Sequence, residues 1–393
     1  MKKYKKVKLI DIIEFQRGKD LTKENMKNGK YPVVGSNGII GYHNKFTTEK
    51  PSITIGRSGN VGRPFIYDGK SWSHNTTLYI KKFKSINPYY IYYLLKNLHL
   101  EEYGGGSTVP TLNRNDIHQQ KVYIPDDLKY QNEVSNFFIS IDKKINLNNK
   151  INDNLFSQIN TIHNYWFIQY EFPNSNGKSY KSNNGELYYN NIIKKDIPIN
   201  WGVETLGNNS LSEIIKPGVN MFKEKMYYTT ADIVGKNIMN GSIVSYKTKE
   251  DRANMQPIPY SVWFAKMKKS IKHLFLTPNL KFVIENSILS TGLCGLKCKE
   301  LAFEYISSYI LHPYFESHKD VLSHGATQEA INNDDLNYIY IIVPEQKILK
   351  QYHNLTKSIF EKISENMCEN KKLIAIRDFL LPLLMNGQAT ISE

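Results

Sequence analysis

The sequence predicts an α+β fold in which two β-rich units alternate with two long helices that pair as an antiparallel coiled coil. The main observation is a duplicated segment, which reads GSTVPTLNRNDIHQQKVYIPD at residues 106–126 and GATQEAINNDDLNYIYIIVPE at residues 325–345. The units of a solenoid recur every ~20–50 residues, so an offset of 219 residues indicates two tandem domains related by a pseudo-two-fold. Two further observations support this: β-forming runs broken by glycine, and a heptad pattern that occurs twice.

Residues 1–125 are predicted to form the first β-rich unit. Runs of Val, Ile, Tyr and Thr alternate with Gly and Asn, as in strands joined by tight turns; the runs are YPVVGSNGIIGYH, PSITIGRSGNVGRPFIYDG and HNTTLYIKK. The stretch NPYYIYYLLKNLHL then has the apolar spacing of a helix packed on a sheet. Residues 198–344 form the second unit, in which AFEYISSYILHPYF is the counterpart of that helix.

Residues 126–170 and 345–393 are predicted to form the long helices, with a polar linker at residues 171–197. Spacings of four and three residues alternate through each helix, which is typical of a coiled-coil seam. An Asn in a seam costs stability but fixes register, so the duplicated Asn pairs are expected to face each other. The alternative is that these Asn lie on a solvated flank. The predicted seam comprises Ile141, Ile145, Asn148, Asn152, Leu155, Ile159, Ile363, Asn366, Asn370, Leu373 and Leu380.

The net charge of +14 favours a polyanionic partner, either nucleic acid or an acidic membrane surface. An AT-rich genome, which enriches proteins in Lys, is the alternative explanation. The three cysteines are sparse, so we expect reduced thiols in a cytoplasmic protein, with Cys294 and Cys298 as core residues. Because the sequence has no long apolar run, we expect neither a signal peptide nor a transmembrane helix, and no membrane partner.

The sequence contains no convincing catalytic signature. It lacks the GxxxxGK[ST] phosphate loop, and its histidines lack the HxxxH and HExxH metal spacings. Asn87-Pro88-Tyr89 lacks the second proline of the NPP[YF] motif of adenine methyltransferases. We therefore expect a non-catalytic protein with no catalytic residue, no metal ligand and no cofactor of its own.

Candidate DNA contacts lie in polar loops, most clearly in the glycine-spaced loop of residues 56–63. Arg and Asn pair bidentately with guanine and adenine edges, and Gly lets a backbone approach a phosphate closely. Ordinary β-turn chemistry is the alternative interpretation. The predicted contacts are Ser36, Asn37, Arg57, Ser58, Asn60, Arg63, His74, Asn75, Arg252, Asn254, Lys266, Lys268, Lys269, Thr327 and Gln328.

This order of units and helices resembles the specificity subunit of type I restriction–modification systems. YPVVGSNGIIGY followed by ITIGRSGNVG resembles the opening of one class of target-recognition domain in that family, and RANMQPIPYSVWFAKM resembles another. GATQEAINNDDLNYIYIIVPEQ resembles the junction between domain and helix, and YWFIQYEFP and LIAIRDFLLPLLMNGQ resemble the two helix ends. One departure follows Pro125, where the family commonly has a Glu-Gln pair; Gln131 is the candidate substitute.

The resemblance implies that residues 1–125 and 198–344 are target-recognition domains, each reading one half of a bipartite, asymmetric site in double-stranded DNA. The two helices would set the spacer and dock two modification subunits that use S-adenosylmethionine to methylate adenine. Where the host has them, two motor/nuclease subunits would add ATP- and Mg-dependent translocation and cleavage. Two alternatives remain, namely a stand-alone DNA methyltransferase with its own recognition domain and a non-specific DNA-binding coiled-coil scaffold.

Overall fold

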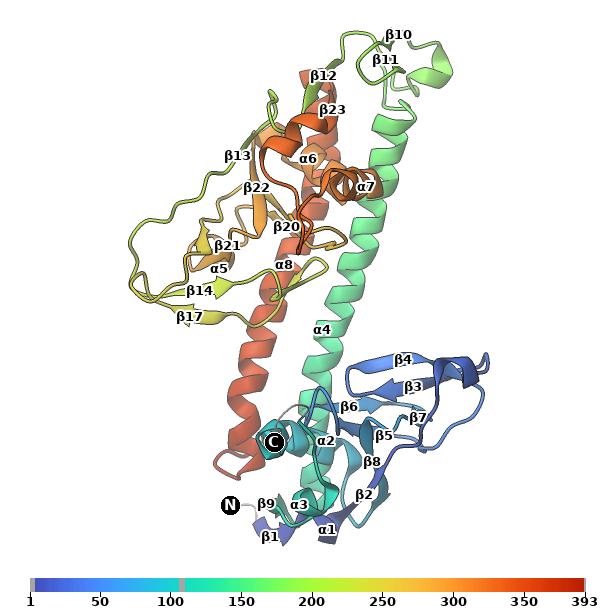
Figure 1. Cartoon of the computed structure of the whole chain (residues 1–393), viewed down its shortest axis with the longest axis vertical. Coiled ribbons are helices and arrows are strands. Elements are labelled where there is room, and N and C mark those ends of the chain that lie inside the picture. The colour runs from blue at the N-terminus through green and yellow to red at the C-terminus, as the bar shows by residue number, and fades with distance from the viewer. Residues whose placement is uncertain (1–3, 106–109, 392–393) are drawn as a thin grey trace. The chain divides into compact units, whose positions relative to one another are not determined.

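The computed structural model describes residues 4–105 and 110–391, so Gly106 and Thr108 of the duplicated segment lie outside the described residues (Figure 1). Two long helices, α4 (Leu128–His163) and α8 (Gln346–Met385), accompany two β-rich parts, which confirms the predicted fold class. The chain divides into unit 1, residues 1–145 with 372–393, and unit 2, residues 146–371. The linear domain boundaries given above stay a prediction. No helix in the described ranges is long and apolar enough to cross a membrane.

Unit 1 is built on an antiparallel sheet of order β2-β8-β5-β6, and its strand β5 (Ser52–Gly56) is buried along its whole length. Its other elements are a sheet of order β4-β3-β7, the pair β1–β9 and three short helices. The bounds are β1 Tyr4–Lys8, α1 Leu9–Ile12, β2 Ile13–Arg17, β3 Tyr31–Gly35, β4 Gly38–His43, β6 Pro64–Tyr67, β7 Trp72–Ser73, β8 Thr77–Phe83, α2 Pro88–Asn97, α3 Arg114–His118 and β9 Lys121–Pro125.

Unit 2 is built on two four-stranded sheets, of order β13-β22-β19-β20 and β17-β14-β21-β18. The pairs β10–β11, β12–β23 and β15–β16 and three short helices complete it. The bounds are β10 Leu187–Asn190, β11 Lys195–Pro198, β12 Gly202–Thr205, β13 Ser212–Ile214, β14 Lys225–Tyr228, β15 Ile233–Val234, β16 Asn237–Ile238, β17 Ser242–Val244, β18 Ala253–Met255, β19 Ser261–Ala265, β20 His273–Leu276, α5 Lys281–Ile284, β21 Ser287–Ser290, β22 Leu293–Cys298, α6 Phe303–Leu311, α7 Pro313–Leu322 and β23 Tyr340–Val343.

The two units share their strand connectivity although their sequences differ. The sheets β2-β8-β5-β6 and β13-β22-β19-β20 are equivalent. In each, the strand that comes first in the sequence pairs with the strand that comes last, β2 with β8 and β13 with β22. A parallel pair also recurs, β3–β7 and β14–β21. The strand that precedes each long helix pairs with a strand at the start of its unit, β9 with β1 and β23 with β12. The duplication therefore extends through the bodies of both units, beyond the segment in which the sequence reveals it.

The Asn87-Pro88-Tyr89 tripeptide is a helix start. The side chain of Asn87 caps α2 by accepting a hydrogen bond of 2.8 Å from Tyr90 N, and Pro88 occupies the first helical turn, where its missing N–H is harmless. The buried Gln131 accepts from Asn87 N at 2.9 Å and donates to the carbonyl of Pro125 at 2.8 Å. Gln131 thus ties the start of α4 to β9 and to the residue that caps α2; that it replaces the family's Glu-Gln pair stays a prediction.

Four asparagines, hereafter the asparagine ladder, join α4 and α8 within unit 2. Asn148 Nδ2 donates to Asn370 Oδ1 at 2.9 Å, and Asn366 Nδ2 donates to Asn152 Oδ1 at 2.7 Å. As the residue number rises in α4 it falls in α8, so the pairing is antiparallel as predicted. All four side chains are buried, and the alternative of a solvated flank is therefore wrong.

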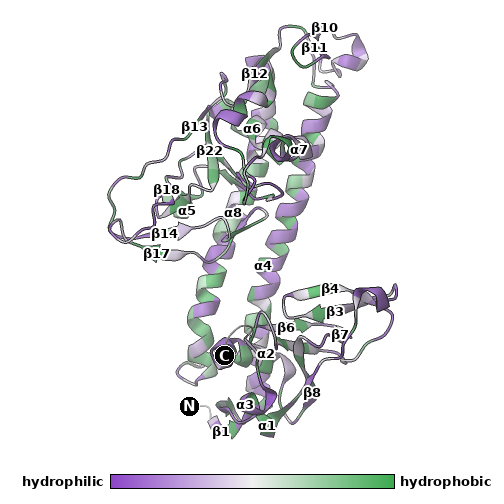
Figure 2. Cartoon of the chain, in the orientation of Figure 1, coloured by the Kyte–Doolittle hydropathy of each residue, from purple (hydrophilic) through white to green (hydrophobic). Residues whose placement is uncertain are grey.

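The buried face of each long helix is wider than a two-position seam. Phe156, next to the predicted seam residue Leu155, is buried, as is Phe360 in α8, whereas the neighbouring Leu155 and Ile359 are only partly buried. The reason is that the cluster containing both phenylalanines also includes residues of α6, β19 and β22, so the helices pack against the sheet unit as well as each other. Figure 2 shows the resulting alternation of hydrophobic and hydrophilic residues along both helices.

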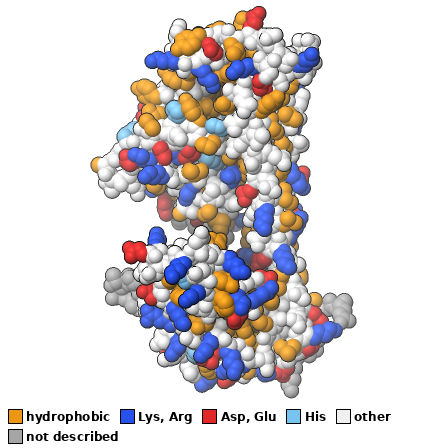
Figure 3. Space-filling model, turned by 90° about the vertical axis from the view of Figure 1, so that its right-hand side faces the viewer, with side chains coloured by type: hydrophobic (Ala, Val, Ile, Leu, Met, Phe, Trp, Pro, Cys, Tyr) orange, Lys and Arg blue, Asp and Glu red, His pale blue; other side chains and the backbone are white. Residues whose placement is uncertain are grey.

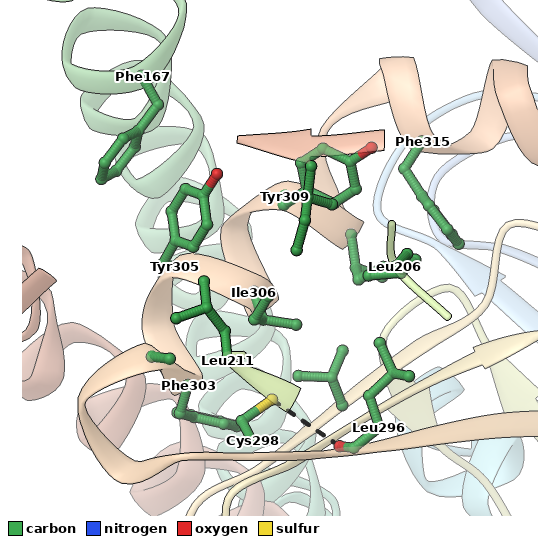
Figure 4. Close-up of a cluster of buried hydrophobic side chains, with 14 of the residues drawn as sticks. Phe167, Leu206, Leu211, Leu296, Cys298, Phe303, Tyr305, Ile306, Tyr309 and Phe315 are labelled. Carbon is green, nitrogen blue, oxygen red and sulfur yellow. Dashed lines mark hydrogen bonds between the residues drawn. The ribbon is translucent and has the colours of Figure 1, made fainter. Parts of the chain in front are cut away.

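The core of unit 2 is dense in aromatic rings. Phe167 packs against Tyr305 with ring centroids 4.6 Å apart, and Figure 4 shows both beside Tyr309 and Phe315. Cys298 lies at the edge of the same cluster, and both it and Cys294 are buried free thiols. Burial raises the pKa of Cys294 to about 12, so its thiol stays uncharged. Both cysteines are core residues, as predicted.

His163, the last residue of α4, is buried in this aromatic cluster. Its ring lies 5.4 Å from that of Phe167 and 6.1 Å from that of Tyr305, and neither ring nitrogen has a hydrogen-bond partner among the described residues. Burial, and secondarily the neighbouring His312, lowers the pKa of His163 to about 3. The folded protein therefore keeps this imidazole neutral.

We expect the stability of unit 2 to fall on acidification, partly through His163. Above pH 6.5 the residue is neutral in both states; below it, the unfolded chain takes up a proton that the folded chain excludes until pH falls to about 3. The loss should reach about 2 kcal/mol at pH 5. Urea unfolding at pH 7.5 and pH 5.0 measures it. A His163→Phe variant should lose this component, whereas the exposed control His324→Phe should retain it; equal acid sensitivity in both variants would contradict the assignment.

Candidate nucleic-acid interface

The loop of residues 56–63 connects β5 to β6 and is held in place by main-chain hydrogen bonds. Arg57 N donates to the carbonyl of Thr76 at 2.8 Å, and Leu112 N donates to the carbonyl of Arg57 at 2.8 Å. Gly62 has φ +81°, and a Cβ there would lie 2.2 Å from Glu101 N, so only glycine fits. These contacts fix the backbone of the loop through main-chain atoms, so the side chain of Arg57 is not needed to hold it.

Thr76, which the sequence did not single out, brings three of the predicted contact segments together. Its carbonyl accepts from Arg57 N, its Oγ1 accepts from Ser36 N at 3.3 Å, and it forms a hydrogen bond of 3.1 Å with His74 Nδ1. Asn75 Nδ2 donates to Asp20 Oδ1 at 2.7 Å. Ser36, Arg57 and His74 are therefore brought together around Thr76, although Ser36 is buried, whereas Asn75 is occupied by a neighbouring carboxylate.

The remaining predicted residues of unit 1 lie on the loop and turn tips. Asn37 and Asn60 are exposed, and Ser58 is half-buried and bridges to Thr111. The guanidinium of Arg63 lies over the ring of Phe65, 5.5 Å from its centroid. Ordinary turn chemistry thus explains the glycines of this loop, and its polar side chains stay available for a ligand.

Three arginines line one cavity beside this loop, Arg17 from β2, Arg57 from the loop and Arg114 from α3. The cavity measures about 490 Å³, and none of the three has a carboxylate partner in the part of the chain that the structure describes. Burial, and secondarily the charge of Arg17, lowers the pKa of Arg57. The sequence identified Arg57 alone, because Arg17 reaches the cavity through the register of β2 on β8 and Arg114 through the position of α3. Figure 3 shows further Lys and Arg side chains over the lower part of the view, which is unit 1.

In unit 2 the loop between β19 and β20 has the same kind of attachment. Ile331 N donates to the carbonyl of Lys266 at 3.1 Å, as Leu112 does to Arg57, and Leu112 and Ile331 correspond in the duplicated segment. Lys268 N and Nζ bind the carbonyl and Oε1 of Glu329 at 2.9 and 2.8 Å. The loop is thereby joined to the exposed segment that carries the predicted residues Thr327 and Gln328.

The other predicted residues of unit 2 adjoin the turn between β21 and β22. The carbonyl of the exposed Arg252 accepts from Thr291 N at 2.8 Å, and Lys266 N donates to the carbonyl of Gly292 at 3.0 Å. Asn254 is half-buried and accepts from Gly218 N at 2.7 Å. The fold thus brings Arg252 and Lys266 to one turn, whereas the bond of Asn254 joins its main-chain carbonyl to a different segment, at Gly218.

A buried ionic cluster on α7 holds the β19–β20 loop in place. Lys319, which is fully buried, pairs with Glu316 Oε2 at 2.6 Å and donates to the carbonyls of Ala265 and Ser270 at 3.2 and 3.0 Å. Glu316 Oε1 also lies 2.7 Å from His273 Nε2. Both ends of the loop are therefore anchored to α7, on which Asp320 also accepts from the amide of the exposed, predicted residue Lys269 at 2.9 Å.

Comparisons with known proteins agree with this arrangement. The profile of the family described as "Type I restriction modification DNA specificity domain" matches residues 1–156. The MjaIX specificity subunit of Methanocaldococcus jannaschii is 27% identical over 321 residues, which cover 77% of this chain and 69% of that protein. Residues 1–156 thus match a type I restriction–modification DNA specificity domain, and the chain is similar over most of its length to a type I specificity subunit.

Two further similarities concern a shorter segment of the sequence and the fold. The HindI specificity subunit of Haemophilus influenzae is 41% identical over 70 residues, 18% of this chain and 15% of that protein. The solved structure of a type I S subunit from M. genitalium covers 100% of this chain, and 97% of its own length, with a TM-score of 0.56 at 15% identity. The specificity-subunit fold thus spans both units and both long helices.

Within the described residues, no three or more His, Cys, Asp or Glu side chains gather closely enough to hold a metal ion. The cations and amides of the interface belong to the groups that bind anions and the edges of bases.

Proposed function

We propose that the chain reads a bipartite DNA site, with residues 1–125 recognising one half and residues 198–344 the other. The observation that carries this proposal is the equivalent attachment of two different loops, the β5–β6 loop and the β19–β20 loop, by the same duplicated segment. A frame that repeats while its loops differ suits a target with two different halves. The stand-alone methyltransferase and the non-specific scaffold receive no support from the comparisons.

The proposal extends to partners and cofactors. The pseudo-symmetric helices α4 and α8 would dock two modification subunits, and those subunits would bind S-adenosylmethionine and methylate adenine in the site. Where present, motor/nuclease subunits would supply ATP- and Mg-dependent cleavage. A DNA target and the absence of disulfides among the cysteines fit a cytoplasmic location.

Exchange of residues 1–125 for the corresponding unit of another family member is expected to change one half of the methylated sequence and leave the other half unaltered. The chain is co-expressed with its modification subunit in a methylation-free host, and methylated adenines are mapped by whole-genome sequencing. Exchange of residues 198–344 is the matched control and should alter only the opposite half. A methylated sequence that is not split, or that changes in both halves after either exchange, would refute the proposal.

A further inference from the structure

The positions of Arg57 in unit 1 and Lys266 in unit 2 are structurally equivalent. Arg57 N donates to the carbonyl of Thr76, one residue before β8, and Lys266 N donates to the carbonyl of Gly292, one residue before β22. The carbonyls of Arg57 and Lys266 both accept from the duplicated segment, as described above. The local sequences around the two residues differ, yet both positions carry a cation.

A second cation accompanies Arg57 in unit 1. Arg17, at the end of β2, pairs with Leu78 of β8, which lies two residues after Thr76. The side chain of Arg17 lines the same cavity as Arg57, so the two guanidinium groups share one space.

Unit 2 has a cation at the corresponding position of its own sheet. The hydrogen bond of 2.8 Å from Ile215 N to the carbonyl of Gly295 extends the pairing of β13 with β22 by one residue. Counting one residue further in this register aligns the exposed Lys216 with Cys294, which lies two residues after Gly292. Lys216 therefore corresponds to Arg17, as Lys266 corresponds to Arg57.

These cations lack internal counter-charges. No ion pair or side-chain hydrogen bond is formed by Arg17, Arg57 or Arg114, nor by Lys216 or Lys266, within the described ranges. Like charges that share a cavity repel one another, which opposes folding and is relieved when an anion binds. In unit 1, an anion bound in the cavity would relieve this repulsion; in unit 2, the argument rests on the matching backbone positions of Lys216 and Lys266.

We propose that Arg17 with Arg57, and Lys216 with Lys266, form equivalent phosphate clamps, one on each half of the DNA site. This inference rests on the proposed function and assigns Arg57 to the DNA backbone instead of to a guanine edge. Side chains that read sequence should differ in chemical character between two units that read different halves, whereas the positive charge that phosphate requires recurs at both pairs of positions. A guanine edge also occupies a single arginine, while the cavity of unit 1 gathers three.

The test measures binding of the full-length chain to two labelled duplexes, one carrying the mapped split site and one of random sequence, from 50 to 300 mM KCl. Two double variants, Arg17→Gln/Arg57→Gln and Lys216→Gln/Lys266→Gln, each remove one clamp. Each should reduce the magnitude of the negative slope of log K against log salt by about 2, because each phosphate contact contributes ~0.9 to that magnitude. Binding to both duplexes should weaken by the same factor, so their affinity ratio stays constant. The control Lys82→Gln, an exposed lysine of β8 without a partner among the described residues, should change neither quantity.

A third variant separates phosphate binding from base reading. Arg57→Lys keeps the charge but loses the planar fork that a guanine edge requires, so it should retain the salt slope and the affinity ratio. Loss of the ratio in Arg57→Lys, or unchanged salt slopes in both double variants, would overturn the clamp while the wild-type chain still binds its site. Absence of DNA binding by the wild-type chain would instead refute the proposed function and the clamp together.

Discussion

Insertion of seven residues after Ile145, in α4 alone, is expected to abolish recognition of the split site. α4 and α8 each run through both units without interruption, and the boundary between units falls after Ile145 in α4 and after Lys371 in α8. The insertion lengthens one helix by about 10 Å while the other keeps its length. Two contacts between the helices, one in each unit, then require different alignments of α4 and α8. The bond between Asp142 and Arg377 in unit 1 and the asparagine ladder in unit 2 can then no longer form together.

A matched insertion of seven residues after both Ile145 and Lys371 is expected to restore recognition, with a wider gap between unchanged half-sites. Each unit keeps all of its internal contacts, and seven residues turn a helix by nearly two full turns. The added length of about 10 Å corresponds to about three base pairs. Mapping of methylated adenines measures the gap directly.

A matched insertion of five residues is the control for this experiment. At about 100° per residue it leaves the two units rotated by about 140° from their native relation, so methylation of a split site should be lost. The proposed spacing role of the helices fails if the seven-residue matched insertion leaves the gap unchanged or alters either half-site.

Substitution of Lys319 by Met is expected to destabilise unit 2 by about 3–5 kcal/mol, because the buried Glu316 then loses its cationic partner and keeps only the contact with His273. The carbonyls of Ala265 and Ser270 also lose their donor, and with it the attachment of the β19–β20 loop to α7. Urea unfolding followed by tryptophan fluorescence measures the loss, and unit 2 contains the buried reporter Trp263.

Lys268→Met is the control, since this lysine belongs to the same loop and also pairs with a glutamate, Glu329, but on the surface. It should cost no more than about 1 kcal/mol. The double variant Glu316→Gln/Lys319→Met removes both charges and should recover part of the stability. Equal effects of Lys268→Met and Lys319→Met would show that the buried cluster contributes nothing beyond a surface ion pair.

The sequence predicted the helices and their antiparallel pairing because periodicity and a duplicated Asn are local, countable signals. It did not predict that Phe156 and Phe360 would be buried, since that depends on the sheet unit packed beside each helix. The shared strand connectivity of the two units was also hidden. Hydrogen bonds between strands depend on main-chain atoms, so the same topology persists under side chains that have no visible similarity.

The candidate interface was predicted from residue types in loops. This criterion selected Arg57 and Lys266 but did not select Arg17 and Lys216. Arg17 sits in a strand whose pattern predicts only alternation of burial, and its meeting with Arg57 depends on the pairing of β2 with β8. Thr76 was missed because its role is to hold other segments by its backbone and hydroxyl. Residues that organise a site through long-range pairing carry no motif of their own.

The bonds from Leu112 to Arg57 and from Ile331 to Lys266 run from main chain to main chain. Such bonds make no demand on the identity of the loop side chains they hold. Substitutions in the β5–β6 and β19–β20 loops can therefore accumulate without loosening the attachment, provided that the backbone path is kept. The duplicated segments can therefore hold loops of different sequence. New half-site preferences are best sought by randomising loop side chains while the two duplicated segments stay unchanged.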